Sequence, residues 1–346
     1  MAGAVIFAVG NAGQIHEEDN FLKRERQRGA ERRGKMRDHL TKTPEMTKES
    51  GCRLCPRKCG VKREEGETGV CGQTNVVKAA RAALHYWEEP CISGTAGSGT
   101  VFFSGCALHC VFCQNKSIAD GTAGKYISTE RLTEIFLELQ AKGANNINLV
   151  TPGHFVPQIA EALTQAKKQG LGLPVVYNTG GYEYADTLRR MEGLVDIYLP
   201  DFKYMDTALG ERYSHAANYS DVAKAAIEEM VRQTGEAVFE GGDEEGLMKR
   251  GTIVRHLVLP GCVEDSKSVI RYLYETYGNT VYISIMNQFT PMPLLVRYPE
   301  INRRVTEAEY EEVVDYAISI GVECGFIQEG GTAEESFIPA FDGEGV

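Results

Sequence analysis

The chain has 346 residues, 42% of them hydrophobic, which is enough for one large α/β domain or two ordinary ones. Its formal net charge of −11 argues against nucleic-acid binding as its main activity. No run approaches the roughly 20 apolar residues of a membrane span, and the apolar start AGAVIFAVG lacks the basic flank of a signal peptide. Ten cysteines in such a chain favour a reducing compartment, the cytoplasm, where clustered cysteines more often bind metal than form disulfides. We therefore expect no nucleic-acid or membrane partner.

The first 50 residues differ from the rest in charge. Residues 21–37 carry eight Lys and Arg against two Glu, a net charge of +6 that leaves −17 for the remainder. This stretch lacks a sustained apolar period, so residues 1–50 are expected to form a basic, disordered tail. A helix over 17–38 and a true start at Met36 or Met46 are the alternatives.

Residues 51–95 are expected to form a Cys-rich, metal-binding segment. Cys52, Cys55, Cys59 and Cys71 follow the spacing C-x2-C-x3-C-x11-C, with Pro, Gly and charged residues between them. A segment with so little apolar material needs something other than a core to hold it together. Four thiols suffice for a closed site, either an auxiliary [4Fe–4S] cluster or a structural zinc ion. The interleaved basic residues favour the iron–sulfur cluster, although both metals accept four thiolates.

From Thr100 onwards, short apolar strands alternate with helical periods. The strands are expected at residues 100–105, 147–150, 174–178, 195–202, 252–260 and 280–286, with a further one at 322–327. The helices are expected at residues 127–143, 155–170, 182–191, 206–214, 220–234, 265–278 and 306–321, the first of them capped by Ser128. Residues 235–251 are acidic and rich in glycine, which is typical of a surface insertion.

This order of elements predicts an α/β fold over residues 96–346. Repeated βα units form a parallel sheet with helices outside it. Six units are too few for an eightfold barrel but can form a partial (β/α)6 barrel of the TIM type, preceded by the Cys-rich segment. In such a barrel the functional residues gather at the carboxyl ends of the strands. The informative loops lie there: the cysteine loop, TPGH, NTGG, DFK, PG and MNQFTP.

The loop after the first strand, SGCALHCVFCQN, has three cysteines. Cys106, Cys110 and Cys113 are spaced C-x3-C-x2-C. Four thiolates close a metal site, whereas three thiolates on a [4Fe–4S] cubane leave one iron open to an exogenous ligand. The alternatives are core thiols or a zinc site with His109 as the fourth ligand. Against zinc, the neighbouring residues His109 and Cys110 rarely reach one tetrahedral ion together.

A loop of this spacing after the first strand of a partial barrel resembles the radical S-adenosylmethionine (SAM) superfamily. GCALHCVFCQN, NTGGYE, DIYLPDFKY and VRHLVLPG, in this order, resemble the glycyl-radical-enzyme activases, whose type is the pyruvate formate-lyase activating enzyme. With CRLCPRKCG, NINLVTPGH and SIMNQFTP, the chain is more closely similar to an activase-like iron–sulfur branch, from about Gly51 to its end. The resemblance implies cluster binding by Cys106, Cys110 and Cys113, and packing of Phe112 on the adenine.

The resemblance also implies an activity, that of a radical SAM oxidoreductase. The reduced cluster would cleave SAM to a 5′-deoxyadenosyl radical that abstracts a hydrogen atom from its substrate. The implied substrate is the glycine loop of a partner glycyl-radical enzyme, and the implied electron donor is a flavodoxin or a ferredoxin.

The sequence departs from many relatives after the second strand. There a Gly-Gly-Glu stretch binds the amino group of the cofactor, whereas this chain has Thr151, Pro152, Gly153 and His154. The glutamate is missing, but the backbone carbonyls of Thr151 and Pro152 can still accept from an ammonium group. His154 is either a residue of the cofactor pocket or a cap of the next helix.

Two further loops match the activases. Asn178 and Thr179 occupy the place of an Asp-Thr pair, and Asp201 and Lys203 match an Asp-x-Lys. The resemblance implies that Asn178, Thr179 and Asp201 help to bind a monovalent cation beside the cofactor carboxylate. It also implies that Lys203 contributes to the active site, so Asp201 and Lys203 are candidate catalytic residues. Asn178 in place of Asp removes a negative charge from that cation site. The alternative for Asp201 and Lys203 is an ion pair at a strand end.

The fifth and sixth strands offer weaker candidates for the pocket. Arg255 and His256 are adjacent on the fifth strand, so one of them points into the barrel and the other outward. Gln288 follows the sixth strand directly.

Other functions remain open at this level. A radical SAM enzyme could act on a small molecule or a peptide, which the extra cysteine group favours because the simplest activases lack it. A radical methylase or a nucleoside-modifying enzyme is disfavoured by the negative charge. A metal-binding redox or structural protein would cleave no SAM.

Overall fold

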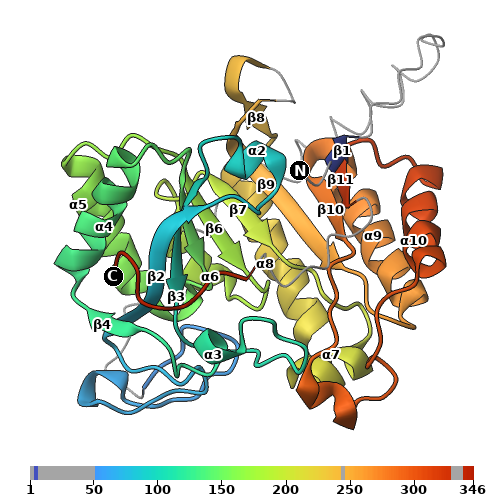
Figure 1. The fold of residues 1–346 in the computed structure, drawn as a ribbon, viewed down its shortest axis with the longest axis horizontal. Helices are drawn as coiled ribbons and strands as arrows, with labels where there is room; N and C mark the ends of the chain where they lie inside the picture. The colour runs from blue at the N-terminus through green and yellow to red at the C-terminus, as the bar shows by residue number, and fades with distance from the viewer. Residues whose placement is uncertain (1–3, 7–50, 243–245, 329–337) are drawn as a thin grey trace, which may run out of the picture. The chain divides into compact units, whose positions relative to one another are not determined.

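The computed structural model describes residues 4–6, 51–242, 246–328 and 338–346 (Figure 1). The chain divides into a compact unit of Met1–Phe7 with Gly51–Val346 and a second unit of Ala8–Ser50. The expected basic tail therefore lies outside the described residues, apart from strand β1 (Ala4–Ile6). Everything below concerns the first unit.

The centre of this unit is a mostly parallel, open sheet. Neighbouring parallel strands follow the order β3-β5-β6-β7-β9-β10-β11. Their bounds are β3 (Ser98–Phe103), β5 (Ile147–Val150), β6 (Val175–Thr179), β7 (Ile197–Pro200), β9 (Met248–Leu257), β10 (Tyr282–Met286) and β11 (Gly325–Gln328). The six predicted barrel strands and the additional last strand are present, which confirms the α/β partial barrel.

Three antiparallel strands, none of them predicted, extend the sheet. β2 (Val77–His85) pairs with β3, β4 (Lys125–Ile127) pairs with β2, and β1 pairs with β11. β2 lies within the stretch expected to bind metal, and its sequence VKAARAALH is rich in alanine. Alanine is depleted in strands, so nothing in its propensity indicated one. Its small side chains are buried under neighbouring elements instead.

The long helices cover the convex face of the sheet (Figure 1). Their bounds are α4 (Thr129–Ala141), α5 (Val156–Lys168), α7 (Thr207–Ser214), α8 (Tyr219–Thr234), α9 (Val263–Tyr277) and α10 (Glu307–Ser319). Leu132 and Phe136 of α4 pack with Leu149 of β5 in one apolar cluster. As predicted, Ser128 caps α4, since its side chain accepts a hydrogen bond from the backbone N–H of Arg131.

Two segments differ from their predicted form. The helix expected over 182–191 is shorter, with only α6 (Ala185–Leu188) and the 3₁₀ turn η4 (Arg189–Met191). β9 begins at Met248, before the predicted start at residue 252, because it pairs with the two-residue strand β8 (Val238–Phe239) of the expected insertion. Among the helices that the structure describes, none is long and apolar enough to cross a bilayer.

The short helix α2 (Pro90–Ser93) closes the amino-terminal end of the barrel (Figure 1). The side-chain amide of Asn146 donates to the carbonyl of Ile92, and that of Asn145 to the carbonyl of Ser93, which anchors α2 ahead of β5. Cys91 and Ile92 pack with inward-facing side chains of the strands in an apolar cluster. Because this apolar floor closes the amino-terminal end, a functional site is expected at the carboxyl end of the barrel.

The described C-terminal residues, 338–346, lie along β2 (Figure 1). The backbone N–H of Gly343 donates to Ala80 (3.0 Å), and that of Ala82 donates to Glu344 (2.8 Å). The ring of Phe341 meets Phe102 of β3 edge to face, with 5.5 Å between the centroids. This segment therefore pairs with part of β2 and covers the inner side of β3.

Candidate active site

A cavity of about 910 Å³ occupies the interior and the carboxyl end of the barrel. That volume is within the range of pockets that bind a cofactor or a substrate. The predicted site residues that line it are Cys106, Cys110, Phe112, Cys113, Thr151, Gly153, His154, Asn178, Thr179, Asp201 and Lys203. Residues from separate loops are thus brought to one place, as the parallel topology predicts.

The cysteine loop follows β3 directly and places its three thiols on the cavity wall. His109 has a left-handed backbone (φ 52°), which turns the loop between Cys106 and Cys110. Cys110 Sγ lies 2.9 Å from the hydroxyl of Ser214. Burial raises the pKa of Cys110, and raises that of Cys113 to about 12. Buried thiols of this kind become thiolates when a metal binds them, which releases protons.

The donor set of this loop fits an iron–sulfur cluster better than one ion. Among the described residues, no three His, Cys, Asp or Glu side chains gather closely enough to hold a single metal ion. A [4Fe–4S] cubane does not require its three cysteines to surround one ion, because each cysteine binds a different iron. His109 also faces elsewhere: its Nε2 lies 2.8 Å from the carbonyl of Val70, and its Nδ1 3.6 Å from Asp120.

The Cys-rich segment packs against the cysteine loop. Arg57 donates from Nε to the carbonyl of Ala107 (2.7 Å) and from Nη2 to the carbonyl of Ser214 (3.0 Å). Its guanidinium also donates to the carbonyl of His215 and lies over the ring of Tyr182. One arginine of the first cysteine group thus fixes the backbone of the second.

The four thiols of the Cys-rich segment face a common region. A side chain at Gly69 would meet the sulfurs of both Cys59 (3.2 Å) and Cys71 (3.5 Å), so glycine leaves the space between them open. Burial raises the pKa of Cys55 to about 12 and also raises that of Cys71. Arg63 lies beside these thiols and provides a compensating positive charge.

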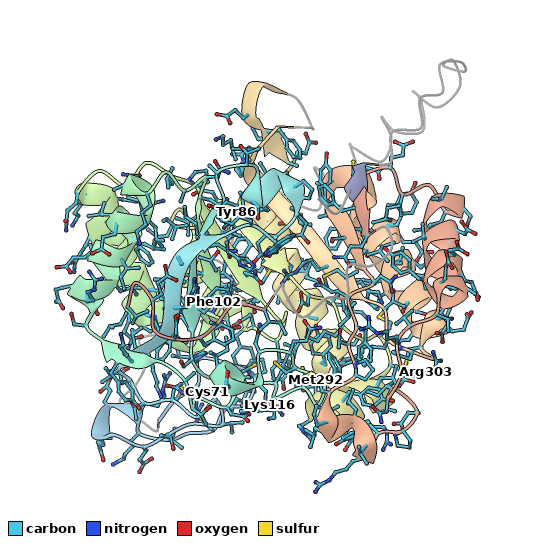
Figure 2. All side chains as sticks on the ribbon, viewed as in Figure 1. Cys71, Tyr86, Phe102, Lys116, Met292 and Arg303 are labelled. Atoms are coloured by element: carbon cyan, nitrogen blue, oxygen red, sulfur yellow. The ribbon has the colours of Figure 1, made fainter. Side chains whose placement is uncertain are left out.

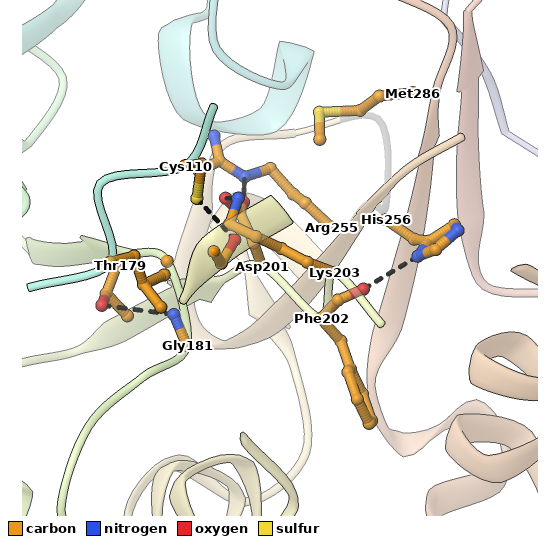
Figure 3. A network of polar contacts seen from close by, with 12 residues as sticks. Cys110, Thr179, Gly181, Asp201, Phe202, Lys203, Arg255, His256 and Met286 are labelled. Carbon is orange, nitrogen blue, oxygen red and sulfur yellow. Dashed lines mark hydrogen bonds and ion pairs between the residues drawn. The ribbon is translucent and has the colours of Figure 1, made fainter. Parts of the chain in front are cut away.

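A network of charged side chains crosses the cavity (Figure 3). Asp201 accepts from Lys203 Nζ (2.6 Å) on one oxygen and from Arg255 Nε (2.9 Å) on the other. Arg255 Nη2 donates to Asn178 Oδ1 (2.6 Å). Burial alone would raise the pKa of Asp201, but Lys203 and Arg255 hold it below its ordinary value. Both carboxylate oxygens are therefore bound to cations that belong to the chain itself.

The structure decides between the two adjacent candidates on the fifth strand. Arg255 points into the cavity, whereas His256 points outward and its Nδ1 lies 2.8 Å from the carbonyl of Phe202 (Figure 3). Gln288 also lines the cavity, and its carbonyl accepts from Gln114 of the cysteine loop (2.9 Å). Phe112 lies against Phe289, with 5.9 Å between the centroids.

The loop after β5 has a strained backbone. Thr151 adopts a left-handed backbone conformation (φ 58°). This conformation is rare for a β-branched residue, and residues with such strained backbones cluster at functional sites. Pro152 does not line the cavity, and its carbonyl accepts from Phe155 N (2.8 Å). His154 is buried, and its Nε2 lies 2.7 Å from the carbonyl of Ser104, which precedes the cysteine loop. Burial lowers the pKa of His154 to about 4, so the neutral ring fixes that loop.

Glu183 is a functional candidate that was not predicted. Its carboxylate comes from the loop after β6 and presses against Gly153, where a Cβ would collide with both oxygens. One oxygen accepts from Thr179 Oγ1 (2.7 Å), and the other is buried without a hydrogen-bond partner. Burial raises the pKa of Glu183 to about 7. The motif NTGGYE contains it, but only the fold places its carboxylate beside the loop that lacks the glutamate.

Glu88 and Glu89 were also not predicted. They follow the half-exposed Tyr86 and Trp87 and precede α2, with both carboxylates buried in the cavity wall. Glu88 binds Arg255 (3.2 Å) and accepts from the side-chain amides of Asn148 and Asn178. Two acidic residues before a proline are an ordinary surface pattern, so their burial could not be predicted from the sequence.

Comparison with known proteins agrees with this site. The sequence model of the Radical SAM superfamily matches residues 100–236, which contain the cysteine loop. An uncharacterised protein of Methanocaldococcus jannaschii is 30% identical over 273 residues, covering 77% of this chain and 74% of that protein. The chain belongs to the radical SAM superfamily, a superfamily of enzymes.

Some solved structures are similar to the chain at lower identity. SuiB of Streptococcus suis bound to S-adenosylmethionine is 12% identical (TM-score 0.43), with 62% of this chain and 45% of that chain covered. Methylornithine synthase PylB is 15% identical (TM-score 0.44; 62% and 59% covered), and the [FeFe]-hydrogenase maturase HydG is 14% identical (TM-score 0.44; 64% and 49% covered). The chain thus spans about half the length of these proteins.

Proposed function

We propose that Cys106, Cys110 and Cys113 bind a [4Fe–4S] cluster and that the cavity binds S-adenosylmethionine beside it. The observation that carries this proposal is the placement of three thiols from one loop on the wall of a large cavity that also has a charged interior. When bound, a reduced cluster of this kind supplies the electron that cleaves the cofactor to methionine and a 5′-deoxyadenosyl radical, which takes a hydrogen atom from a substrate.

The residues around the cavity bind and orient the cofactor. Glu183 accepts from its ammonium group, since one carboxylate oxygen is buried without a partner next to Gly153. Lys203 presents a cation on the same wall as Cys110, which suits the cofactor carboxylate. Phe112 offers an apolar face to the adenine, and the carbonyl of Thr151 is a further acceptor.

Arg255 takes over the role that the activases give to a monovalent cation. Its guanidinium binds Asp201 and Asn178, two of the three positions that the resemblance assigns to that ion, the third being Thr179. Because Asp201 also binds Lys203, its charge is already compensated. Under this proposal, SAM binding needs neither potassium nor sodium.

The first candidate substrate is the glycine loop of a partner glycyl-radical enzyme, with a flavodoxin or ferredoxin as the electron donor in the cytoplasm. The ordered motifs shared with the activases support it. The second candidate is a small molecule or a peptide. The polar interior beyond the cysteine loop supports this alternative, because Glu88 and Glu89 give the deep part of the cavity a recognition surface of its own.

We also propose an auxiliary [4Fe–4S] cluster at Cys52, Cys55, Cys59 and Cys71. The proximity of these thiols to Arg57 and Arg63, and the contact of Arg57 with the cysteine loop, support a cluster that relays electrons. Iron counting tests it: a double Cys52→Ala, Cys55→Ala variant is expected to lose about four irons per chain. An unchanged iron content together with lost zinc would contradict the cluster.

The main test is anaerobic reconstitution with iron and sulfide, followed by dithionite and S-adenosylmethionine. We expect 5′-deoxyadenosine from the wild-type chain and none from Cys113→Ala. A variant that keeps this activity would refute the ligand assignment. A glycine-centred radical on an added partner protein would select the activase function.

A further inference from the structure

The interior of the barrel has more carboxylates than cations. The charged belt, defined here as Glu88, Glu89, Asp201, Lys203 and Arg255, lines the cavity between the apolar floor and the cysteine loop. Asp201 is bound by Lys203 and Arg255, and Glu88 is bound by Arg255 at 3.2 Å. Both cations of the belt are therefore paired with two of its three carboxylates.

Glu89 is the carboxylate that is left over. Its residue is only 9% exposed, and its Oε2 is buried without a hydrogen-bond partner. Within the described part of the chain, Glu89 forms no ion pair within 4 Å. The positive charge of Arg255 acts on its carboxyl only through space, and Ser284 of β10 lies beside it. Burial raises the pKa of Glu89, and a ligand that brings a positive charge would stabilise its ionised form and so gain affinity here.

The position of Glu89 separates it from the cofactor. It stands at the start of α2, which leads to the amino-terminal end of β3, whereas the cysteine loop follows the carboxyl end of that strand. The six residues of β3 span about 17 Å at about 3.3 Å per residue. In Figure 2, Tyr86, which lies just before Glu88, and Cys71 of the Cys-rich segment lie on opposite sides of Phe102. A molecule bound at Glu89 therefore lies deeper in the barrel than one bound at the cysteine loop.

We propose that Glu89 recognises the substrate and that the substrate has a protonated amine or a guanidinium group. This inference rests on the proposed function, because it places the substrate beside a cofactor held at the cysteine loop. Removal of a hydrogen atom from carbon leaves the charge of the substrate unchanged. The ion pair with Glu89 can thus hold the molecule both before and after that step.

The test uses three probes of equal length and different charge. Full-length, reconstituted protein is titrated without oxygen with n-hexylammonium, 1-hexanol and hexanoate, by calorimetry and by the fluorescence of Trp87, the only tryptophan of the chain. We expect the ammonium to bind at least about tenfold more tightly than the alcohol, because a hydrogen bond between charged groups is stronger than one from a neutral hydroxyl. Equal affinities for the three probes would overturn the proposal.

Two variants locate the effect. Glu89→Gln is expected to remove the preference for the ammonium over the alcohol, whereas Glu89→Asp, which keeps the charge, retains part of it. The exposed Glu134→Gln is the matched control and should keep the full preference. If Glu89→Gln retains it, the proposal is wrong. Should Glu89→Gln fail to fold, the wild-type probe series and Glu89→Asp still decide.

The outcome is separate from that of the proposed function. The probe series is run both with and without S-adenosylmethionine, and cofactor cleavage is assayed independently. Cleavage without a preference for the ammonium would refute only the role of Glu89. A preference for the ammonium without any cleavage would refute the proposed function while leaving a cation site at Glu89.

Discussion

Two buried carboxylates in this cavity, Glu183 and Glu89, each have an oxygen without a hydrogen-bond partner. In a folded core such oxygens are rare, because each one loses its hydrogen bonds to water and gains none within the protein. The fold keeps them at opposite parts of one cavity. Each is best explained by a cationic group that arrives from outside the chain, the cofactor ammonium at Glu183 and a substrate cation at Glu89.

Glu183 allows a prediction on stability against pH. Its pKa is raised by burial from 4.5 to about 7, so the folded chain holds this proton more tightly than the unfolded chain does. Below about pH 4.5 the group is protonated in both states and costs nothing. As the pH rises through 7, the folded state has to bury a carboxylate, and stability falls by up to about 3 kcal/mol.

Glu183→Gln should therefore unfold later than the wild type at pH 8, with the difference shrinking towards pH 5. Thermal unfolding of cofactor-free protein measures this, and the exposed Glu161→Gln is the control at a solvated glutamate. The same variant should bind S-adenosylmethionine about tenfold more weakly, since it loses a charged acceptor. An equal difference in unfolding temperature at both pH values would mean that the pKa of Glu183 is the same in the folded and the unfolded chain.

At the scale of elements, the predictable parts of the fold are those with a strong period. The six barrel strands and helices such as α4 and α10 were located by apolar spacing, and α4 also by its cap Ser128. The structure adds a capping box of Thr306 and Glu309 at the start of α10. β2 was missed because its alanines have no strand propensity and gain their burial only from tertiary packing. Glu183 was missed for a related reason, since its role depends on contact with a loop 30 residues earlier.

Arg57 of the Cys-rich segment forms hydrogen bonds with the cysteine loop and with Ser214, and we therefore expect it to stabilise that loop. Arg57→Ala removes hydrogen bonds to the carbonyls of Ala107 and Ser214. Bonds from a charged donor contribute about 1.5–3 kcal/mol, so we expect the loop to open more often and to release iron to a chelator about tenfold faster. Lys62→Ala is the control, because the side chain of Lys62 pairs with the exposed Glu65.

Absorbance of the reconstituted protein during anaerobic chelation measures that rate. Equal rates for wild type, Arg57→Ala and Lys62→Ala would show that the Cys-rich segment does not stabilise the cysteine loop. A faster loss in the Lys62→Ala variant alone would place the stabilising contact elsewhere in the segment.

At the scale of the folded unit, the open barrel needs different covers for its different sides. The floor formed by α2 closes the amino-terminal end, the Cys-rich segment packs on the cysteine loop, and residues 338–346 lie along β2. An open barrel exposes apolar inner side chains at its gap, and Phe102 is one that the C-terminal segment covers. The enclosed interior thus depends on segments outside the βα repeat.

This dependence predicts the effect of removing residues 338–346. Truncation deletes the two backbone hydrogen bonds to Ala80 and Ala82 and the contact of Phe341 with Phe102. At about 1 kcal/mol for each hydrogen bond and about 1–2 kcal/mol for the apolar contact, we expect a loss of about 3–4 kcal/mol in the free energy of unfolding. Urea denaturation measures it, and binding of an apolar dye reports the exposed inner side of β3. Phe341→Leu, which keeps an apolar side chain over Phe102, should lose less than half as much. If the truncated chain unfolds at the same urea concentration as the full chain, the segment is not part of the wall that encloses the cavity.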